Sequence, residues 1–401
     1  MNVVIIGCGV VGAAIAYQLS QEKGLKITVC DRQPPAQAST GAALGVLMGV
    51  ISQKIKGKAW QMRQTSIQRY ETLIPELEAL TGRKIPFNRQ GILSLGLQEE
   101  NLAAWEKLVE IRHSQGWNLE IWDAAKLQNI CPQVAHKKIT GAVYSPQDRQ
   151  LDPTALTLAL VEAAQQNGVT FKFGVTVLDA PNSTSEFCHC LETTEGKIAA
   201  DWFVIAAGLG STPLTAKLNQ IIDIRPVLGQ ALQMRVGHLL GNPDFQPAIT
   251  GNDVHIVPVG GGDYWVGATV EFPRNGDEIP PNQELLESVR KQAIAFCPEL
   301  ATATILRTWS GLRPRPEGRP APVIGKLPGF SNVLLATGHY RNGVLLAPAT
   351  AYAIREMIIS QGMGGAEEQG SRGAGEQRSR GAEEQRSRGA GEQKRIIISD
   401  K

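Results

Sequence analysis

The sequence lacks an excess of either charge and lacks a long apolar run. Its 40 Lys and Arg nearly balance 38 Asp and Glu. Without a global basic field, neither nucleic acid nor an anionic membrane is expected as a partner. No uncharged apolar run reaches the roughly 18 to 20 residues that a membrane-spanning helix requires. At 401 residues and 42% hydrophobic content, the chain is long enough for two globular domains.

Cysteine is also scarce and is not spaced for metal binding. The six cysteines are at positions 8, 30, 131, 188, 190 and 297, and only Cys188 and Cys190 are close together. This pattern favours free thiols in a reducing compartment over a disulfide framework or a zinc site. The N-terminus is apolar but has no basic leader, so we expect no secretion signal, and a cytoplasmic protein.

What the chain does contain is a glycine turn between two apolar runs. Residues 3–6 are apolar, and residues 7–12 follow the pattern Gly-x-Gly-x-x-Gly. An alanine-rich segment covers 13–20, and a second apolar run covers 25–30. This order predicts the strand, turn, helix and second strand of a dinucleotide-binding βαβ unit. The alternative is an ordinary turn that merely tolerates glycine.

Each glycine of this turn, and the acid after the second run, has a physical role in that prediction. Gly7 allows a tight turn, and Gly9 lets the backbone approach a pyrophosphate at the helix N-terminus. Gly12 lets the helix pack closely on the strand. Asp31 lies 19 residues beyond Gly12, about where a carboxylate meets a ribose hydroxyl.

Several elements elsewhere are predicted with equal directness. Asp152 is expected to cap a helix that has Pro153 at its first position. A second helix is expected over 57–80, with Pro75 able to kink or break it. Residues 254–270 predict a hairpin around Gly-Gly-Gly-Asp. Residues 362–395 repeat every eight residues without large apolar side chains, which predicts disorder.

Four separated segments together resemble a known family. They are the glycine turn with Asp31, the small-residue stretch 39–45, Trp309–Pro314 and Ala336–Pro348. This set resembles the FAD-dependent amine and amino-acid oxidases of the D-amino-acid oxidase superfamily. The last segment is especially similar to glycine oxidase, which supplies the imino acid for thiazole formation in thiamine biosynthesis.

The resemblance, which covers about residues 1–360, implies the fold class and the domain organisation. It implies an α/β plus α+β fold with a Rossmann-like FAD-binding domain and an inserted antiparallel-sheet substrate domain. The FAD-binding domain is expected over 1–85, 145–221 and 310–361, the substrate domain over 86–144 and 222–309, and a disordered repetitive tail over 362–401.

The resemblance also implies a substrate site. Arg313 matches the family's carboxylate-binding position, where a planar guanidinium forms two parallel hydrogen bonds. Arg341 matches a second arginine near substrate and flavin. His255 stands where glycine oxidases usually have a tyrosine, and Val270 where a methionine is expected, so pocket volume and substrate range stay open. For these arginines and His255, the alternatives are a surface arginine, a loop-anchoring ion pair and a core histidine.

The FAD contacts are implied in the same way. The closing helix is expected to point its positive N-terminal end at the flavin's pyrimidine side, where negative charge collects on reduction. Val175 matches an adenine contact, with a core-strand role as the alternative. No catalytic acid or base and no metal are expected. The expected cofactor residues are Gly7, Gly9, Val10, Val11, Gly12, Asp31, Arg32, Ser39, Thr40, Ala43, Leu44, Gly45, Val175, Gly208, Gly338, His339, Tyr340, Arg341, Asn342, Gly343, Val344 and Leu345.

The implied reaction is oxidation of a small amino acid by flavin and oxygen. Glycine, and with it sarcosine or small D-amino acids, would give an imino or keto acid, ammonia and hydrogen peroxide. Two alternatives remain: a D-amino-acid dehydrogenase that passes electrons to another acceptor, and a non-catalytic nucleotide-binding scaffold. A homo-oligomer and a thiazole synthase partner also remain open.

Overall fold

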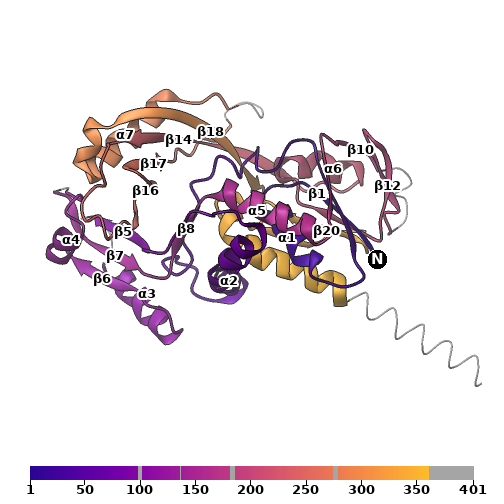
Figure 1. The fold of residues 1–401 in the computed structure, drawn as a ribbon, viewed down its shortest axis with the longest axis horizontal. Coiled ribbons are helices and arrows are strands. Elements are labelled where there is room, and N and C mark those ends of the chain that lie inside the picture. Colours follow the sequence, from indigo (N-terminus) through magenta and orange to yellow (C-terminus); the bar gives the residue numbers. More distant parts are fainter. Residues whose placement is uncertain (98–101, 136, 181–185, 274–278, 361–401) are drawn as a thin grey trace, which may run out of the picture. The chain divides into compact units, whose positions relative to one another are not determined.

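The first glycine turn follows the first strand of the chain, and this strand lies in a six-stranded sheet. The computed structural model describes residues 1–97, 102–135, 137–180, 186–273 and 279–360 (Figure 1). The strand order is β19-β20-β13-β1-β2-β9, and every pairing is parallel except β19 with β20. Its strands are β1 (Asn2–Ile6), β2 (Lys26–Asp31), β9 (Thr170–Phe173), β13 (Trp202–Ile205), β19 (Val323–Lys326) and β20 (Val333–Thr337).

The apolar sequence of the central strands explains their position. β13 and β20 are buried at every residue, and β1 is buried from Val3 onward. A continuous apolar run of this kind suits a parallel strand covered on both faces. One covering layer includes α1 (Val10–Ser20), which packs against α5 (Pro153–Gln166). The α-helix α2 (Gly57–Thr81) packs on α5 in turn.

Two local predictions for these helices can now be compared with the structure. The Asp152 carboxylate accepts hydrogen bonds from the N–H groups of Thr154 (2.8 Å) and Ala155 (3.0 Å), so the predicted cap is confirmed. Pro75, in contrast, lies inside the uninterrupted α2. The neighbouring Leu73 and Ile74 are buried, so tertiary packing holds the helix across the proline.

A second sheet has eight strands and is antiparallel except where β5 meets β15. Two long strands, β14 and β18, pair from Ile224 opposite Pro316 to Arg235 opposite Thr304. Figure 1 shows these strands arching from α7 toward the first sheet. In sheet order the strands are β18 (Thr304–Pro316), β14 (Ile224–Arg235), β17 (Asp263–Gly267), β16 (Val254–Gly260), β15 (Ala248–Gly251), β5 (Ile92–Leu97), β7 (Ile139–Ser145) and β6 (Glu120–Asp123).

An amphipathic helix completes the core of this second sheet. α7 (Gln283–Phe296) packs on β16 and β17, burying Leu286, Val289, Ala293 and Phe296. Its N-cap, Asn282, accepts from two backbone N–H groups, as expected for an amphipathic helix start. The predicted hairpin is confirmed as β16 and β17, although β17 ends at Gly267 rather than at residue 270.

The remaining elements are two small sheets together with several helices and helical turns. Two three-stranded sheets have the orders β10-β11-β12 and β3-β8-β4. These elements are β3 (Val46–Leu47), β4 (Phe87–Asn88), α3 (Leu102–Ser114), α4 (Ala124–Ile130), β8 (Arg149–Leu151), β10 (Val177–Asp179), β11 (Cys190–Thr193), β12 (Gly196–Ala199), η1 (Gly208–Gly210), α6 (Ser211–Lys217), η2 (Pro298–Thr302) and η3 (Tyr340–Asn342).

Residues Met1–Ile354 form one compact unit. The finer boundaries between a FAD-binding and a substrate domain stay a prediction. The expected disordered tail, 362–401, lies outside the described residues. The closing helical segment Tyr340–Ser360 has the length and composition of a membrane span, but half of its apolar window is buried, as in a core helix.

Candidate functional site

A cavity of about 510 Å³ lies where the two large sheets approach each other. From the first sheet it is lined by the turn after β1 and by the end of β2. From the second sheet it receives Gly229, His255 and Arg313. The volume is within the range of sites for small molecules and cofactors. Its position beyond the carboxyl ends of parallel strands is where open α/β sheets bind ligands.

The glycine turn forms one end of this cavity. Gly7 has a φ of +107°, and a Cβ there would lie 2.5 Å from the Ala206 carbonyl oxygen. A Cβ on Gly12 would lie 1.9 Å from the Gly7 carbonyl oxygen, so close packing of helix on strand requires glycine. No side chain caps α1 at Gly9, and no acidic residue occupies its first turn. An anionic group can therefore take the place of the cap.

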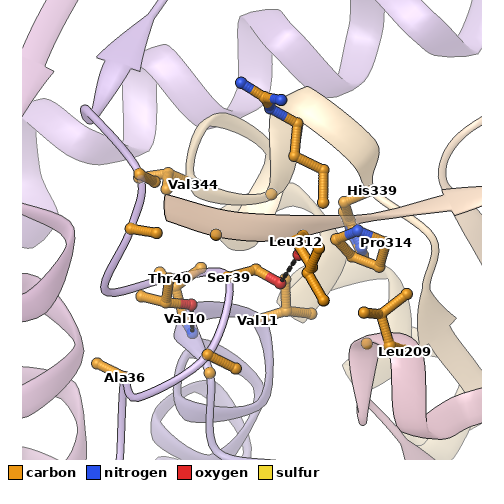
Figure 2. A pocket seen from close by; sticks show the side chains of 18 of the residues that line it. Val10, Val11, Ala36, Ser39, Thr40, Leu209, Leu312, Pro314, His339 and Val344 are labelled. Atoms are coloured by element: carbon orange, nitrogen blue, oxygen red, sulfur yellow. Dashed lines mark hydrogen bonds between the residues drawn. The ribbon is translucent and has the colours of Figure 1, made fainter. Parts of the chain in front are cut away.

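The loop over 36–45 closes this end of the cavity, as Figure 2 shows. Thr40 Oγ1 accepts a hydrogen bond of 3.1 Å from the Val10 N–H, and Ser39 Oγ donates one of 2.6 Å to the Leu312 carbonyl oxygen. The loop thus links the start of α1 to β18. Its small side chains, which include Ala43, leave room for a flat ligand beside Leu44.

Asp31 is fixed at the cavity wall by backbone donors. Its two carboxylate oxygens accept hydrogen bonds from the N–H groups of Cys8 (2.6 Å) and Gln33 (2.9 Å). Burial and the nearby Asp31 charge raise the pKa of the Cys8 thiol, which therefore stays protonated. The carboxylate retains further lone pairs for a ligand hydroxyl.

Arg313 lines the part of the cavity that β14, β16 and β18 form, and main-chain carbonyl oxygens hold its guanidinium. Its Nη1 donates to the carbonyl oxygens of Leu228 (3.1 Å) and Thr269 (3.0 Å). Burial, together with the charge of Arg341, lowers the pKa of Arg313, but a guanidinium remains charged at neutral pH. A fixed cation in a cavity wall is suited to a carboxylate ligand.

Arg341, Asp253 and His255 complete this part of the cavity. Arg341 Nη1 lies 3.1 Å from Asp253 Oδ1. Burial lowers the pKa of His255 to about 4, and the charges of Arg341 and Arg313 act in the same direction, against that of Asp253. The ring is therefore neutral at pH 7. Its Nδ1 is buried and has no hydrogen-bond partner in the described part of the chain, which points to a ligand.

The turn before the closing helix lines the cavity from Ala336 to Leu345, except for Asn342. Tyr340 adopts a positive φ of 53° there. His339 is 4% exposed, and its Nε2 lies 3.0 Å from Thr350 Oγ1. Burial lowers its pKa to about 4, so His339 is a neutral structural group at pH 7 rather than an acid or base.

The structure gathers nearly all the expected site residues around this one cavity. Three expected cofactor residues do not line it: Gly12, Val175 and Asn342. Val175 is buried, and its N–H donates to the Asp31 carbonyl oxygen (3.0 Å). Val175 thus contacts the end of β2 from a position just beyond β9 (Thr170–Phe173), and its contact with the adenine stays a prediction. Gly12 acts through packing, as its predicted role requires.

The sequence analysis missed several lining residues, and Gly229 and Asp253 are two that matter for the substrate side of the cavity. Gly229 lies inside β14, and a glycine within a strand often marks a close approach by another group. Asp253 follows Asn252 between β15 and β16, and such a pair is a recognised hairpin signal. Neither signal by itself identifies which group approaches. In the described residues, no cluster of three or more His, Cys, Asp or Glu could hold a metal.

Comparison with known proteins gives this geometry a context. The family model DAO, FAD dependent oxidoreductase, matches residues 2–357. The bifunctional protein ThiO/ThiG of Synechocystis sp. is 32% identical over 90% of this chain, which spans 52% of that protein. The chain thus spans about half the length of that relative. Glycine oxidase of Geobacillus kaustophilus is 27% identical, over 89% of this chain and 92% of that protein.

Solved structures show the same similarity. The crystal structure of glycine oxidase from Geobacillus kaustophilus aligns with a TM-score of 0.80 and 26% identity, covering 89% of this chain and 94% of that one. Glycine oxidase from Bacillus cereus aligns with a TM-score of 0.79 and 25% identity, covering 90% and 95%. The expected α/β plus α+β fold is thereby confirmed.

FAD is the cofactor of this family, and the cavity fits it. Glycine at positions 7 and 9 avoids contacts that a Cβ would make with the Ala206 carbonyl oxygen and the Thr40 hydroxyl. Gly9 adds no side-chain cap to α1, so the start of this helix suits a pyrophosphate. Asp31 stands at the end of β2 for a ribose hydroxyl. The loop over 39–45 and the turn over 338–345 border the remaining length, where a planar ring can lie beside Arg313 and His255.

Proposed function

Because the chain belongs to the DAO family of FAD-dependent oxidoreductases, we propose that it oxidises glycine, and with it sarcosine and small D-amino acids. The products are the imino acid, which hydrolyses to a keto acid and ammonia, and hydrogen peroxide from oxygen. The observation that carries this proposal is the backbone-held Arg313 in the wall that the second sheet contributes to the cavity, beside the neutral His255.

Arg313 binds and orients the substrate. With Nη1 anchored on two carbonyl oxygens, the guanidinium can offer its outer N–H groups to a carboxylate without losing its position. A carboxylate fixed in this way points the α-carbon in a set direction, which is the contribution of positioning to rate. FAD, when bound, accepts the hydride that leaves the α-carbon.

His255 and the wall around it select for a small substrate. The neutral imidazole can accept a hydrogen bond from the substrate ammonium or donate one to its carboxylate. Gly229, Ala231, Ala268 and Val270 also line the cavity, and none carries a large side chain. Glycine and short amino acids therefore fit better than large ones.

The closing helix can stabilise negative charge in the cavity. Residues 338–345, apart from Asn342, line the cavity and lead directly into the helix over 343–360, so its positive end faces the ligand space. A positive helix end stabilises negative charge that develops near it during oxidation of the substrate. No side chain in the described residues has to act as a strong base for this reaction.

Two further features extend the proposal beyond the active site. All six cysteines are free thiols, in keeping with the cytoplasmic compartment that the sequence predicts. The ThiO/ThiG relative is a bifunctional protein by name, which supports a role of this chain in thiamine biosynthesis. A thiazole synthase would then be the partner that receives the imino acid.

Anaerobic mixing of the yellow holoprotein with glycine, sarcosine and D-alanine tests the proposal. We expect rapid bleaching of the flavin, followed by peroxide formation when oxygen is admitted. Arg313→Lys should lower kcat/KM about 100-fold, because a bidentate charge-assisted pair contributes about 3 kcal/mol. Arg319→Lys, on an exposed segment outside the cavity, is the matched control.

Three outcomes would count against this assignment. A colourless protein, or bleaching that Arg313→Lys leaves unchanged, contradicts the cofactor or the substrate role. Dye reduction without oxygen uptake would instead indicate a dehydrogenase.

A further inference from the structure

The ion pair between Arg341 and Asp253 lies at the substrate end of the cavity, and both residues line it. Their side chains are 38% and 68% exposed, so neither charge is buried in protein. Two arginines thus face one ligand space, and of these Arg341 is the one that the described residues pair with a carboxylate that also lines the cavity. This asymmetry has a consequence for which substrates the site can bind.

The backbone explains how Asp253 reaches the cavity. Gly251 pairs with Val254, so Asn252 and Asp253 alone connect β15 to β16. Both have positive φ, 46° and 62°, as a tight two-residue hairpin turn requires. Asparagine and glycine tolerate this conformation at least as well as aspartate. The turn therefore requires the backbone conformation but does not require the negative charge.

The charges around the cavity end can be added group by group. Arg313 and Arg341 are positive, Asp253 is negative, and His255 is neutral because burial lowers its pKa to about 4. Arg313 is held by backbone carbonyl oxygens, which carry no formal charge. Glu271 also acts on Arg313 with its charge, but it is buried and does not line the cavity. The groups that line this part of the cavity thus carry two positive charges and one negative charge, which matches a ligand with one carboxylate.

We propose that Asp253 is a specificity-determining residue that restricts the site to amino acids with a single carboxylate. It does so by holding Arg341 and by repelling a second anionic group at the cavity mouth. Without the Asp253 charge, Arg341 would bind the second carboxylate of a ligand such as iminodiacetate. This inference rests on the proposed function, because it takes Arg313 as the site of the first carboxylate.

The test uses two ligands that differ only in the second carboxylate. Methoxyacetate and oxydiacetate are the ether counterparts of sarcosine and iminodiacetate, and without an amine they cannot form an imine. Their affinities for the FAD-loaded protein can be measured by calorimetry without turnover. Asp253→Asn retains the turn preference and removes the charge. We expect it to bind oxydiacetate about tenfold more tightly and methoxyacetate within about twofold of the original protein.

Two controls separate the charge effect from a structural one. Asp223→Asn removes the same kind of charge from an exposed Arg–Asp pair outside the cavity and should change neither affinity. Adding Arg341→Met to Asp253→Asn should abolish the gain for oxydiacetate. If Asp253→Asn is poorly folded, Asp253→Gly keeps the turn and serves in its place.

The proposal is wrong if Asp253→Asn leaves the ratio of the two affinities unaltered, either because neither affinity changes or because both change by the same factor. Failure of the proposed function looks different. In that case glycine and sarcosine would not bleach the flavin, whatever the ratio of the two ether ligands.

Discussion

The guanidinium of Arg313 lies directly across the Cα of Gly229. A Cβ at position 229 would be 2.3 Å from both Nη1 and Nη2 and 2.4 Å from Cζ. The strand register explains this approach: β14 and β18 pair Val227 with Arg313 and Gly229 with Gly311, so the arginine side chain extends along its neighbour strand. Any side chain at 229 would occupy the space of the guanidinium.

Gly229→Ala should therefore displace Arg313 and weaken substrate binding. We expect KM for glycine to rise at least about tenfold, corresponding to about 1.4 kcal/mol, while FAD content stays unchanged. Steady-state kinetics with flavin quantification measures both quantities. Gly96→Ala is the control, since a Cβ there would meet the Gly141 carbonyl oxygen at 3.4 Å in the same sheet, far from the cavity. An unaltered KM for glycine in Gly229→Ala would show that substrate binding does not depend on this position of the Arg313 guanidinium.

The buried carboxylate of Glu271 supports Arg313 indirectly, through the residues that hold it. Glu271 is 6% exposed and accepts hydrogen bonds from Gln230 Nε2 (2.7 Å), Thr269 Oγ1 (2.5 Å) and the Asn282 N–H (2.9 Å). Its backbone exchanges two hydrogen bonds of 2.9 Å with Leu228. The carbonyl oxygens of Leu228 and Thr269 are the two that hold Arg313. Glu271 thus holds in place the two residues whose carbonyl oxygens accept hydrogen bonds from Arg313.

Glu271→Gln should cost about 1 to 3 kcal/mol of unfolding free energy, because an amide N–H₂ replaces an acceptor among buried donors. It should also raise KM for glycine several-fold with little change in kcat, as expected of a positioning residue. Urea unfolding and steady-state kinetics check the two parts. Glu195→Gln, on a side chain that is 52% exposed and paired with Lys172, should change stability by less than about 0.5 kcal/mol. Lost stability with an unchanged KM would contradict the positioning role.

The sequence predicted the features that depend on local pattern. The glycine turn, the Asp152 cap and the β16–β17 hairpin follow from residue type and spacing over a few positions. The resemblance to an oxidase family added Arg313, Arg341 and His255, which the fold brings to one cavity.

Features that depend on strand register could not be predicted from the sequence. The approach of Gly229 to Arg313 joins strands 84 residues apart in the chain. Asp253 and Arg341 are 88 residues apart, and only the hairpin tip and the turn after β20 bring them together. The hydrogen bond from the Val175 N–H to the Asp31 carbonyl oxygen also joins segments far apart in the chain, and no local pattern predicted it. Pro75 shows a further limit, since tertiary burial overrides a local helix breaker.

Acid should destabilise the protein in a specific window because of His339. Burial lowers its pKa from 6.5 to about 4, so between these values the unfolded chain binds a proton that the folded chain does not. Stability is therefore complete above about pH 6.5 and is lost as the pH falls toward 4. At pH 5 this single histidine should lower the unfolding free energy by about 2 kcal/mol relative to pH 7.

His339→Gln removes the titrating group and can keep a hydrogen bond to Thr350. We expect the difference in unfolding free energy between pH 7 and pH 5 to shrink by about 2 kcal/mol in this variant, even if its stability at pH 7 is lower. His238→Gln is the control, because that ring is 60% exposed beside Glu299. Its pH dependence should match the original protein. Equal pH dependence in His339→Gln and the original protein would mean that His339 is protonated as readily in the fold as in the unfolded chain.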